Sequence, residues 1–436
     1  MWNSAVAATG VREATGGPVP ASRYPGIAAG GNRGWVLVAQ KNERPTANLN
    51  GMTQFADLTM VQRPAATTER APGRAVPAKG GGAHGFFEVT EDVSELTKAD
   101  FLQPGRRTPV YARFSSVAGA LGSADTVRDP RGFAVRFGTR QGNYDLAGNS
   151  TPVFFIRDPR KVLDFIRSRN RQGDTSGNDM RWDFWTSTPE SAHQVTILMT
   201  DRGIPWAWAN MNGYAGRTYL WENPSGVKFW VKYHWKTEQG VVTFTDAEAR
   251  AMVAEDPDFH LRGLRASIAR GEDPVWRLET QVMPFEAAAD YRVNPFDLTK
   301  VWPHADFPPV TVGRMVLNRN PENRVAPATL EPASTAPAIG PGWQVGEIVR
   351  AAHAKHRADD PFAQPGALYR DVLTEPDRVH LVTNIANHLR DGVQPDVLTR
   401  ALAFWSDVDA QLGARVAKAM TDSGRRRPLS LRTTLR

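Results

Sequence analysis

The sequence predicts an α+β protein built on a large antiparallel β-barrel or sandwich, with helices inserted and appended. Short β-type runs, each bounded by turn residues, recur between about residues 84 and 320. In residues 229–236, the side chains alternate between two sets with the period of two that is typical of a half-buried strand. Many short strands of even spacing indicate an antiparallel barrel or sandwich. One helical insert is predicted near 246–270.

Further elements follow from the same patterns. Two helices are expected near 375–390 and 395–420, and Thr374 is a plausible N-cap of the first. The first helix has an apolar stripe of Val379, Val382, Ile385, Ala386 and Leu389. Additional strands are expected in segments 108–114, 132–138, 151–156, 193–199, 217–222 and 276–283.

Composition narrows the function classes. The chain has 436 residues and a formal net charge of +7, and the positive charge is spread along the chain, so we expect a solvated surface and no nucleic-acid partner. There is no cysteine, which excludes disulfides, iron–sulfur clusters and thiolate chemistry. No apolar run is long enough for a membrane span or a signal sequence, so a cytoplasmic protein without a membrane partner is expected.

Long motifs in residues 108–323 identify a family. They include the runs TPVYARFSSVAGALGSADTVRDPRGFAVRF (108–137), DLAGNSTPVFFIRDP (145–159), WDFWTSTPESAHQVTILMTDRGIP (182–205), MNGY (211–214), NPFDLTKVWPH (294–304) and NRNPEN (318–323). In order and spacing these resemble the barrel domain of the haem catalases over about 74–323. The helices near 375–420 resemble the family's C-terminal region more weakly.

The resemblance implies a catalase-type fold, namely an eight-stranded antiparallel β-barrel with an N-terminal arm, a wrapping loop and C-terminal helices. It also implies a homo-oligomer, a tetramer or a dimer, in which the arms intertwine. The expected divisions are an extended arm (1–60), the barrel domain (61–320), the wrapping loop with the remnant of a helix (321–365), the C-terminal helical region (366–424) and a basic tail (425–436).

The resemblance also exposes a departure at the peroxide-binding side. The family pattern R-V-V-H-A-K-G corresponds here to residues 74–80, and Pro77 stands at the position of the catalytic histidine. Proline has neither a titratable side chain nor a backbone N–H, so it cannot shuttle a proton. Asn149 matches the family's catalytic asparagine and Ser116 its nearby hydroxyl; Asn149 either binds a ligand or is tied to backbone. His84, the nearest histidine, is either structural or a substitute.

A second departure affects the expected iron ligand. The family pattern G-R-L-F-x-Y-P-D-T-H-R corresponds best to residues that begin at Gly346. The tyrosine position becomes Ala351, or Arg350 with a one-residue shift, and the supporting arginine becomes Glu347. The family also has a histidine that supports this arginine, and Asn210 stands at the position of that histidine. The resemblance therefore implies no metal ligand at the family position.

Two histidines further along the same helix are alternatives. A helix advances about 100° per residue. His353 lies two residues after Ala351 and therefore points about 200° away from it around the helix axis. His356 lies five residues after Ala351 and points about 140° away. They are either substitute iron ligands that require the helix to rotate, or surface and cap residues.

Cofactor binding is implied only in part. The resemblance assigns propionate contacts to Arg74, Arg113 and Arg357, although these arginines could instead pair with acids such as Asp125 and Asp129. It assigns the lining of the ligand cavity to Val76, Phe154 and Phe155. The family's NADPH pocket corresponds to His193, Arg202, Val301, Trp302 and His304, residues that also occur in members without nucleotide.

Two functional hypotheses follow. The first is a divergent haem-dependent oxidoreductase, acting on peroxide or another small molecule with little or no ordinary hydrogen peroxide dismutation. The second is a haem-free protein with the catalase fold that binds a small molecule or acts as a scaffold. Haem and NADPH both remain open as cofactors.

Overall fold

The structure is a computed structural model that describes residues 79–117, 123–169, 177–322, 343–356 and 358–422. The expected arm (1–60), the basic tail (425–436) and most of the 321–345 linker lie outside these residues. So do four residues singled out above, which are Arg74, Val76, Pro77 and Arg357.

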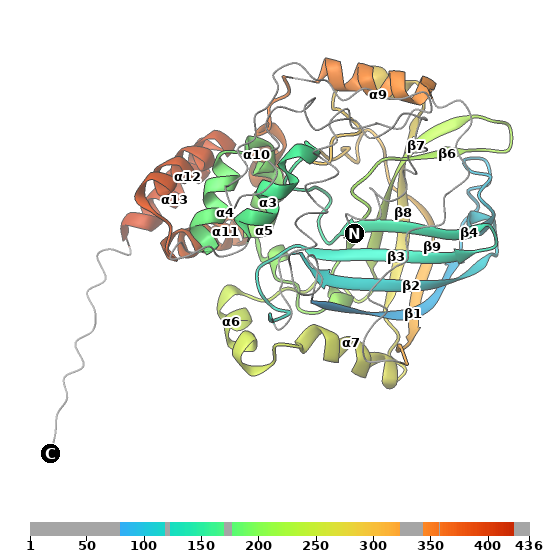
Figure 1. The fold of residues 1–436 in the computed structure, drawn as a ribbon, viewed down its shortest axis with the longest axis horizontal. Coiled ribbons are helices and arrows are strands. Elements are labelled where there is room, and N and C mark those ends of the chain that lie inside the picture. The colour runs from blue at the N-terminus through green and yellow to red at the C-terminus, as the bar shows by residue number, and fades with distance from the viewer. Residues whose placement is uncertain (1–78, 118–122, 170–176, 323–342, 357, 423–436) are drawn as a thin grey trace, which may run out of the picture.

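Eight strands close into an antiparallel barrel (Figure 1). Their order is β5-β4-β3-β2-β1-β9-β8-β7, and β7 pairs back with β5; β6 pairs with β7 outside the ring. This confirms the predicted antiparallel barrel. The strands are β1 (Gly80–Val89), β2 (Arg107–Ser116), β3 (Arg131–Thr139), β4 (Gly142–Asn149), β5 (Gly213–Tyr214), β6 (Tyr219–Glu222), β7 (Lys228–Thr237), β8 (Val275–Pro284) and β9 (Val310–Arg319).

Helices surround the barrel on three sides (Figure 1). Helices α6 and α7 lie along one side, α9 lies along the opposite side, and α3 to α5 form a layer with α10 to α13. The α-helices are α3 (Val162–Ser168), α4 (Gly177–Thr186), α5 (Ala192–Met199), α6 (Asp246–Glu255), α7 (Phe259–Ala269), α8 (Ala287–Asp290), α9 (Trp343–Lys355), α10 (Ala363–Ala367), α11 (Glu375–Arg390), α12 (Pro395–Val408) and α13 (Ala410–Asp422). Single turns include η3 (Pro159–Lys161), η5 (Asp201–Gly203) and η6 (Trp208–Asn210).

Three sequence-based predictions of local structure were wrong. Residues 193–199 belong to α5, whose residues are all buried. A continuous buried run has no periodicity that separates a strand from a helix. Residues 151–156 form no strand. The expected helix 395–420 is two helices, because Asp409 is extended and its carboxylate accepts the N–H groups of Gln411 and Leu412 at the start of α13.

The helical insert predicted near 246–270 is present as two helices, α6 and α7, and the predicted helix near 375–390 is confirmed. Thr374 caps α11 as expected, because its side chain accepts the backbone N–H of Asp377 and the Asp377 side chain accepts the backbone N–H of Thr374. Four members of the predicted stripe are buried, whereas Val379 is exposed. No helix among the described residues is long and apolar enough to cross a membrane.

Aromatic rings fill the barrel. The ring of Phe133 lies 4.9 Å from that of Phe114, 5.6 Å from Trp276 and 6.4 Å from Trp235, measured between centroids. All four side chains are almost fully buried. Large rings packed edge to face remove much apolar surface from water. The barrel interior is therefore a solid core, and ligands must bind at its rim or outside it.

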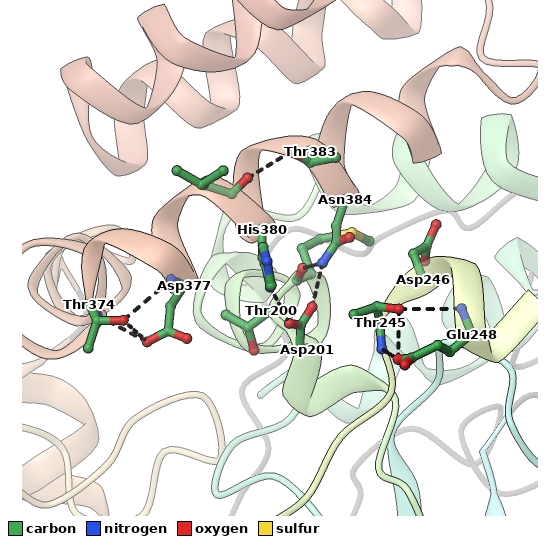
Figure 2. Close-up of polar contacts among 12 residues, drawn as sticks. Thr200, Asp201, Thr245, Asp246, Glu248, Thr374, Asp377, His380, Thr383 and Asn384 are labelled. Atoms are coloured by element: carbon green, nitrogen blue, oxygen red, sulfur yellow. Dashed lines mark hydrogen bonds and ion pairs between the residues drawn. The ribbon is translucent and has the colours of Figure 1, made fainter.

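A second core joins the C-terminal helices to α3 to α5. It contains Trp182 and Trp185 on α4 and Leu381 and Ile385 on α11. At the edge of this core, Asp201 on η5 accepts hydrogen bonds from His380, at 2.6 Å, and from the amide of Asn384, at 3.0 Å (Figure 2). One carboxylate thus anchors α11 to the segment that follows α5.

The barrel closes through the two-residue strand β5. Asn149 of β4 pairs with Tyr214 of β5, which pairs with His234 of β7. The backbones approach closely there, because a Cβ atom on Gly148 would lie 1.9 Å from the carbonyl oxygen of Tyr214. Only glycine fits at position 148 without a shift of the backbone.

We expect Gly148→Ala to destabilise the protein by about 1–3 kcal/mol, since the added methyl group forces β4 and β5 apart. Urea unfolding followed by circular dichroism would measure the change. The matched control is Gly216→Ala, because a Cβ atom there meets no atom within 4 Å. Equal free energies of unfolding for the two variants would contradict the argument.

Buried histidines make the fold sensitive to acid. Burial lowers the pKa of His193 to about 4, and that of His234, His260 and His388 to about 3, from an ordinary value of 6.5. In addition, Nδ1 of His388 accepts a hydrogen bond from the indole of Trp182 at 2.9 Å. Between pH 6.5 and these lowered values the unfolded chain binds more protons than the folded one. The stabilisation is therefore complete above pH 6.5 and is lost as the pH falls.

We expect the free energy of unfolding to fall steadily from pH 7 to pH 4.5, by up to about 1.4 kcal/mol per pH unit for each buried histidine. In His388→Asn, whose side-chain oxygen can still accept from Trp182, the slope should decrease by about one proton. Urea titrations at several pH values would test this. The control His353→Asn changes an exposed residue, so it should leave the slope unchanged; a slope unaffected by His388→Asn would refute the assignment.

Candidate functional site

Two residues predicted to bind a ligand, Ser116 and Asn149, lie at one rim of the barrel. Strand β3 begins between them, so that Arg131 pairs with Ser116 and Gly132 pairs with Asn149. Directly paired residues share a face of the sheet, and successive residues alternate. Ser116 and Asn149 are therefore brought to the same rim but on opposite faces.

The outer face of the sheet combines Asn149 with a residue that sequence reasoning missed. Phe114 points into the barrel core, so Arg113 and Ser115 lie on the outer face. Ser115 pairs with Gly132 and so shares the face of Asn149. The Ser115 hydroxyl is buried and has no hydrogen-bond partner among the described residues. Alternation along the strand, counted from Arg113, could have found it.

Small residues occupy the space between these polar groups. Arg113 pairs with Ala134, which pairs with Ala147, and Gly132 lies two residues before Ala134 on the same face. Gly132, Ala134 and Ala147 thus form a row of small residues, here called the platform, with Arg113 and Asn149 at different positions along it. Gly132 and Ala134 are buried, and Ala147 is half-buried.

Buried charges fix the turn beside this rim. The guanidinium of Arg131 donates to the carbonyl oxygens of Asp125, at 2.9 Å, and Val127, at 2.6 Å. Burial lowers the pKa of Arg131 to about 10, so the group remains charged at neutral pH. The Asp129 carboxylate accepts the backbone N–H of Val117 at 2.5 Å and forms a buried ion pair with Arg169.

Asp125 and Asp129, the acids considered as alternative partners for the arginines of the ligand site, each lie beside another cation. Asp125 lies 4.0 Å from the ammonium of Lys79, and burial raises the pKa of Asp125. Asp129 pairs with Arg169, as described. These contacts stabilise the turn between β2 and β3, and thereby hold the ends of both strands in register at the rim.

The two phenylalanines expected to line the ligand cavity lie in different environments. Phe155 is fully buried in the second core, where its ring stacks on Trp185 with 6.0 Å between centroids. Phe154 is half-buried and packs at the edge of that core. Phe154 is therefore the one of the two with a partly accessible surface.

Helix α9 carries the position of the expected iron ligand. Ile348, Ala352 and His356 face the protein at intervals of four residues, whereas Arg350 and Ala351 are exposed. Ile348 belongs to a core with Trp230, Met283, Phe285, Ala288 and Trp302. Both alternative ligand positions thus point to solvent. Glu347 has no described side chain.

The substitute histidines are also engaged elsewhere or exposed. His353 is exposed. The ring nitrogens of buried His356 lie 3.0 Å from a carboxylate oxygen of Asp359 and 2.8 Å from the carbonyl oxygen of Tyr291. The amide of Asn210 donates to the carbonyl oxygens of Gln239 and Gly240, and so supports the loop after β7.

The residues compared with a nucleotide pocket lie around a very small cavity. It has a volume of about 10 Å³ and is lined by Pro152, Tyr214, Ala215, Lys232, Tyr233, His234, Gln281, Val301 and Trp302. Of the predicted set, Val301 and Trp302 line it directly. Arg202 lies 3.5 Å from the hydroxyl of Tyr214, and the exposed His304 lies 6.1 Å from His234 between ring centroids. His193 is fully enclosed nearby, and burial lowers its pKa.

These residues fit one half of a haem site. Arg113, Ser115 and Asn149 place a cation and two hydrogen-bonding groups beside the platform. Helix α9 offers no iron ligand from its described side chains, and the described residues contain no group of three potential metal ligands. The platform thus supplies a cation and hydrogen-bonding groups that suit the edge of a haem, whereas the described side chains of α9 supply no ligand for its iron.

Comparisons with known proteins agree with the barrel topology. The sequence model of the catalase family matches residues 32–344, and that described as catalase-related immune-responsive matches residues 355–420. The bromoperoxidase-catalase of Streptomyces venezuelae is 39% identical, with 88% of this chain and 96% of the relative covered. The catalase of Methanosarcina barkeri is 42% identical, with 81% and 86% covered.

Solved structures give the same result. A bacterial catalase superposes with a TM-score of 0.73 at 35% identity, covering 91% of this chain and 97% of the other. Catalase A of Saccharomyces cerevisiae superposes with a TM-score of 0.71 at 30% identity, covering 87% and 96%. With its closed eight-stranded barrel and its C-terminal helices, this chain belongs to the catalase family.

Proposed function

We propose that this protein is a catalase-related oxidoreductase that acts on peroxide or another small molecule with little or no ordinary dismutation of hydrogen peroxide. The observation that carries the proposal is Pro77, at the position where the family pattern has its histidine. Dismutation needs a group that takes a proton from one oxygen and returns it to the other, and histidine titrates in the required range. Proline cannot do so.

The polar groups of the platform support this reading. The Asn149 amide and the Ser115 hydroxyl can hydrogen-bond a ligand, but neither group exchanges a proton readily near neutral pH. His84 also lies on the outer face of the barrel, two residues along β1 from Gly82, which pairs with Arg113. Burial and the charge of Arg319 lower the pKa of His84, so its ring is neutral at pH 7.

Haem is the cofactor implied by the family, and when bound it supplies the iron that reacts with peroxide. Arg113, Ser115 and Asn149 would contact its edge and one face, together with Arg74 and Val76 from the sequence motif. At the family's iron-ligand position stands Ala351 or Arg350, neither of which is an ordinary haem ligand, and both are exposed on α9.

The second candidate function is a haem-free catalase-fold protein that binds a small molecule or acts as a scaffold. The engaged ring nitrogens of His356 and the exposure of Arg350, Ala351 and His353 favour it. In this case the platform would hold a flat anionic molecule other than haem.

Three further properties belong to the proposal. We place the protein in the cytoplasm and expect a homotetramer or homodimer. NADPH is a candidate second ligand near His193, Arg202, Val301, Trp302 and His304, provided that the small cavity beside Trp302 opens.

Oxygen evolution from hydrogen peroxide tests the main proposal. After saturation with haem, the purified protein should evolve oxygen at least roughly 100-fold more slowly than a catalase of the family, since removal of a general base costs roughly 10²–10⁴-fold. A catalase that has the complete R-V-V-H-A-K-G pattern is the control. Rates equal to those of that control would refute the proposal.

The absorption spectrum separates the two candidate functions. Protein from a haem-replete host should show a Soret band at about one haem per chain if the haem-dependent function is correct. Arg113→Gln should then reduce haem retention, because a cation at the platform is lost, whereas the exposed control Arg277→Gln should not. A protein without any Soret band would exclude the first candidate and leave the second.

A further inference from the structure

A second polar cluster lies on the outer side of the barrel, where α7 crosses β1 and β9. We call His84, Tyr111, Arg265 and Arg319 the Tyr111 cluster. Each comes from a different element, namely β1, β2, α7 and β9. His84 pairs directly with Tyr111 on one side and with Arg319 on the other. Tyr111, His84 and Arg319 are thus neighbours on three adjacent strands, and the β1–β9 register shifts by a bulge directly after His84.

Tyr111 is the buried centre of the cluster. Its side chain is 8% exposed, and its hydroxyl has no hydrogen-bond partner among the described residues. The ring contacts that of His84 with 4.8 Å between centroids. The hydroxyl lies over Gly82, since a Cβ atom there would be only 2.7 Å away. An unsatisfied buried hydroxyl is unfavourable, so a ligand that accepts a hydrogen bond from it would stabilise the fold.

Two positively charged side chains influence the Tyr111 hydroxyl. Burial raises the pKa of Tyr111, while the neighbouring guanidinium groups of Arg113 and Arg265 act in the opposite direction. The phenol is thus a neutral donor at pH 7. The charge of Arg319 lowers the pKa of His84, whereas the charge of Glu322 raises it.

Helix α7 presents Arg265 from a fixed position. The amide of Asn320, just after β9, donates to the backbone carbonyl of Arg265 at 3.0 Å. The Arg265 side chain is half-buried, and Arg319 is exposed. The cluster therefore runs from the buried hydroxyl of Tyr111, past the half-buried Arg265, to Arg319 at the surface.

We propose that the Tyr111 cluster is a binding site for an oxyanion, the carboxylate or phosphate group of a small ligand. In this site the Tyr111 hydroxyl donates a hydrogen bond to one oxygen, and Arg265 and Arg319 donate to the others. Guanidinium groups suit this task because their planar donors match the oxygens of carboxylates and phosphates. The site uses neither peroxide chemistry nor a metal, so it is independent of the function proposed above.

Isothermal titration calorimetry with inorganic phosphate, and separately with acetate, tests the proposal on the full chain at constant ionic strength. We expect saturable binding with one site per chain for at least one of them. Saturation by phosphate alone assigns a phosphoryl ligand, and saturation by both assigns a general oxyanion site. Tyr111→Phe and Arg265→Gln should each weaken binding by about tenfold.

The matched controls keep the test specific. Arg314→Gln removes an exposed guanidinium on the same strand as Arg319, which is paired with Glu88, and should leave binding unchanged. Circular dichroism establishes that each variant is folded, and Tyr111→Phe retains the ring contact with His84. Absence of saturable binding with both anions, or an unchanged dissociation constant in Arg265→Gln and Tyr111→Phe, would overturn the proposal.

Discussion

The closure of the barrel by β5 is the constraint on which the site depends. Two residues, Gly213 and Tyr214, join β4 to β7 and turn an open sheet into a ring. The ring fixes which side chains point inward, and the inward set is a core of large aromatic residues. Everything that can meet a ligand is thereby placed on the rim or the outer face. The same closure sets Asn149 beside Tyr214, at the end of a strand whose register with β3 is continuous.

Register then decides which of the polar residues act together. Along β2, Arg113 and Ser115 share the outer face with Tyr111, whereas Ser116 belongs to the inner row with Phe114. One strand thus contributes both to the platform and to the Tyr111 cluster. The buried charges of Arg131 and Asp129 maintain this arrangement, because their hydrogen bonds hold the turn that leads from β2 to β3.

Sequence patterns predicted the barrel and several helices because these depend on local periodicity and on long motifs. They failed for α5, where every residue is buried and the spacing carries no information. They also passed over the break at Asp409, a capping interaction that a helical pattern does not reveal. In the site, motif matching selected Asn149 and Arg113, which share a face. It could not show that Ile348 and Ala352 would turn Arg350 and Ala351 of α9 to solvent, since that follows from packing on Trp302 and its neighbours.

The core between α3 to α5 and α11 to α13 has a consequence for how the chain is divided. The two family models meet between residues 344 and 355, yet Phe155, Trp182 and Trp185 from the first share their packing with Leu381, Ile385 and Trp405 from the second. Residues on both sides of that boundary bury one another in this second core, although the barrel has a core of its own. The C-terminal helices therefore complete a hydrophobic core that α3 to α5 begin, and a cut at the boundary between the two family models would expose apolar residues on both sides.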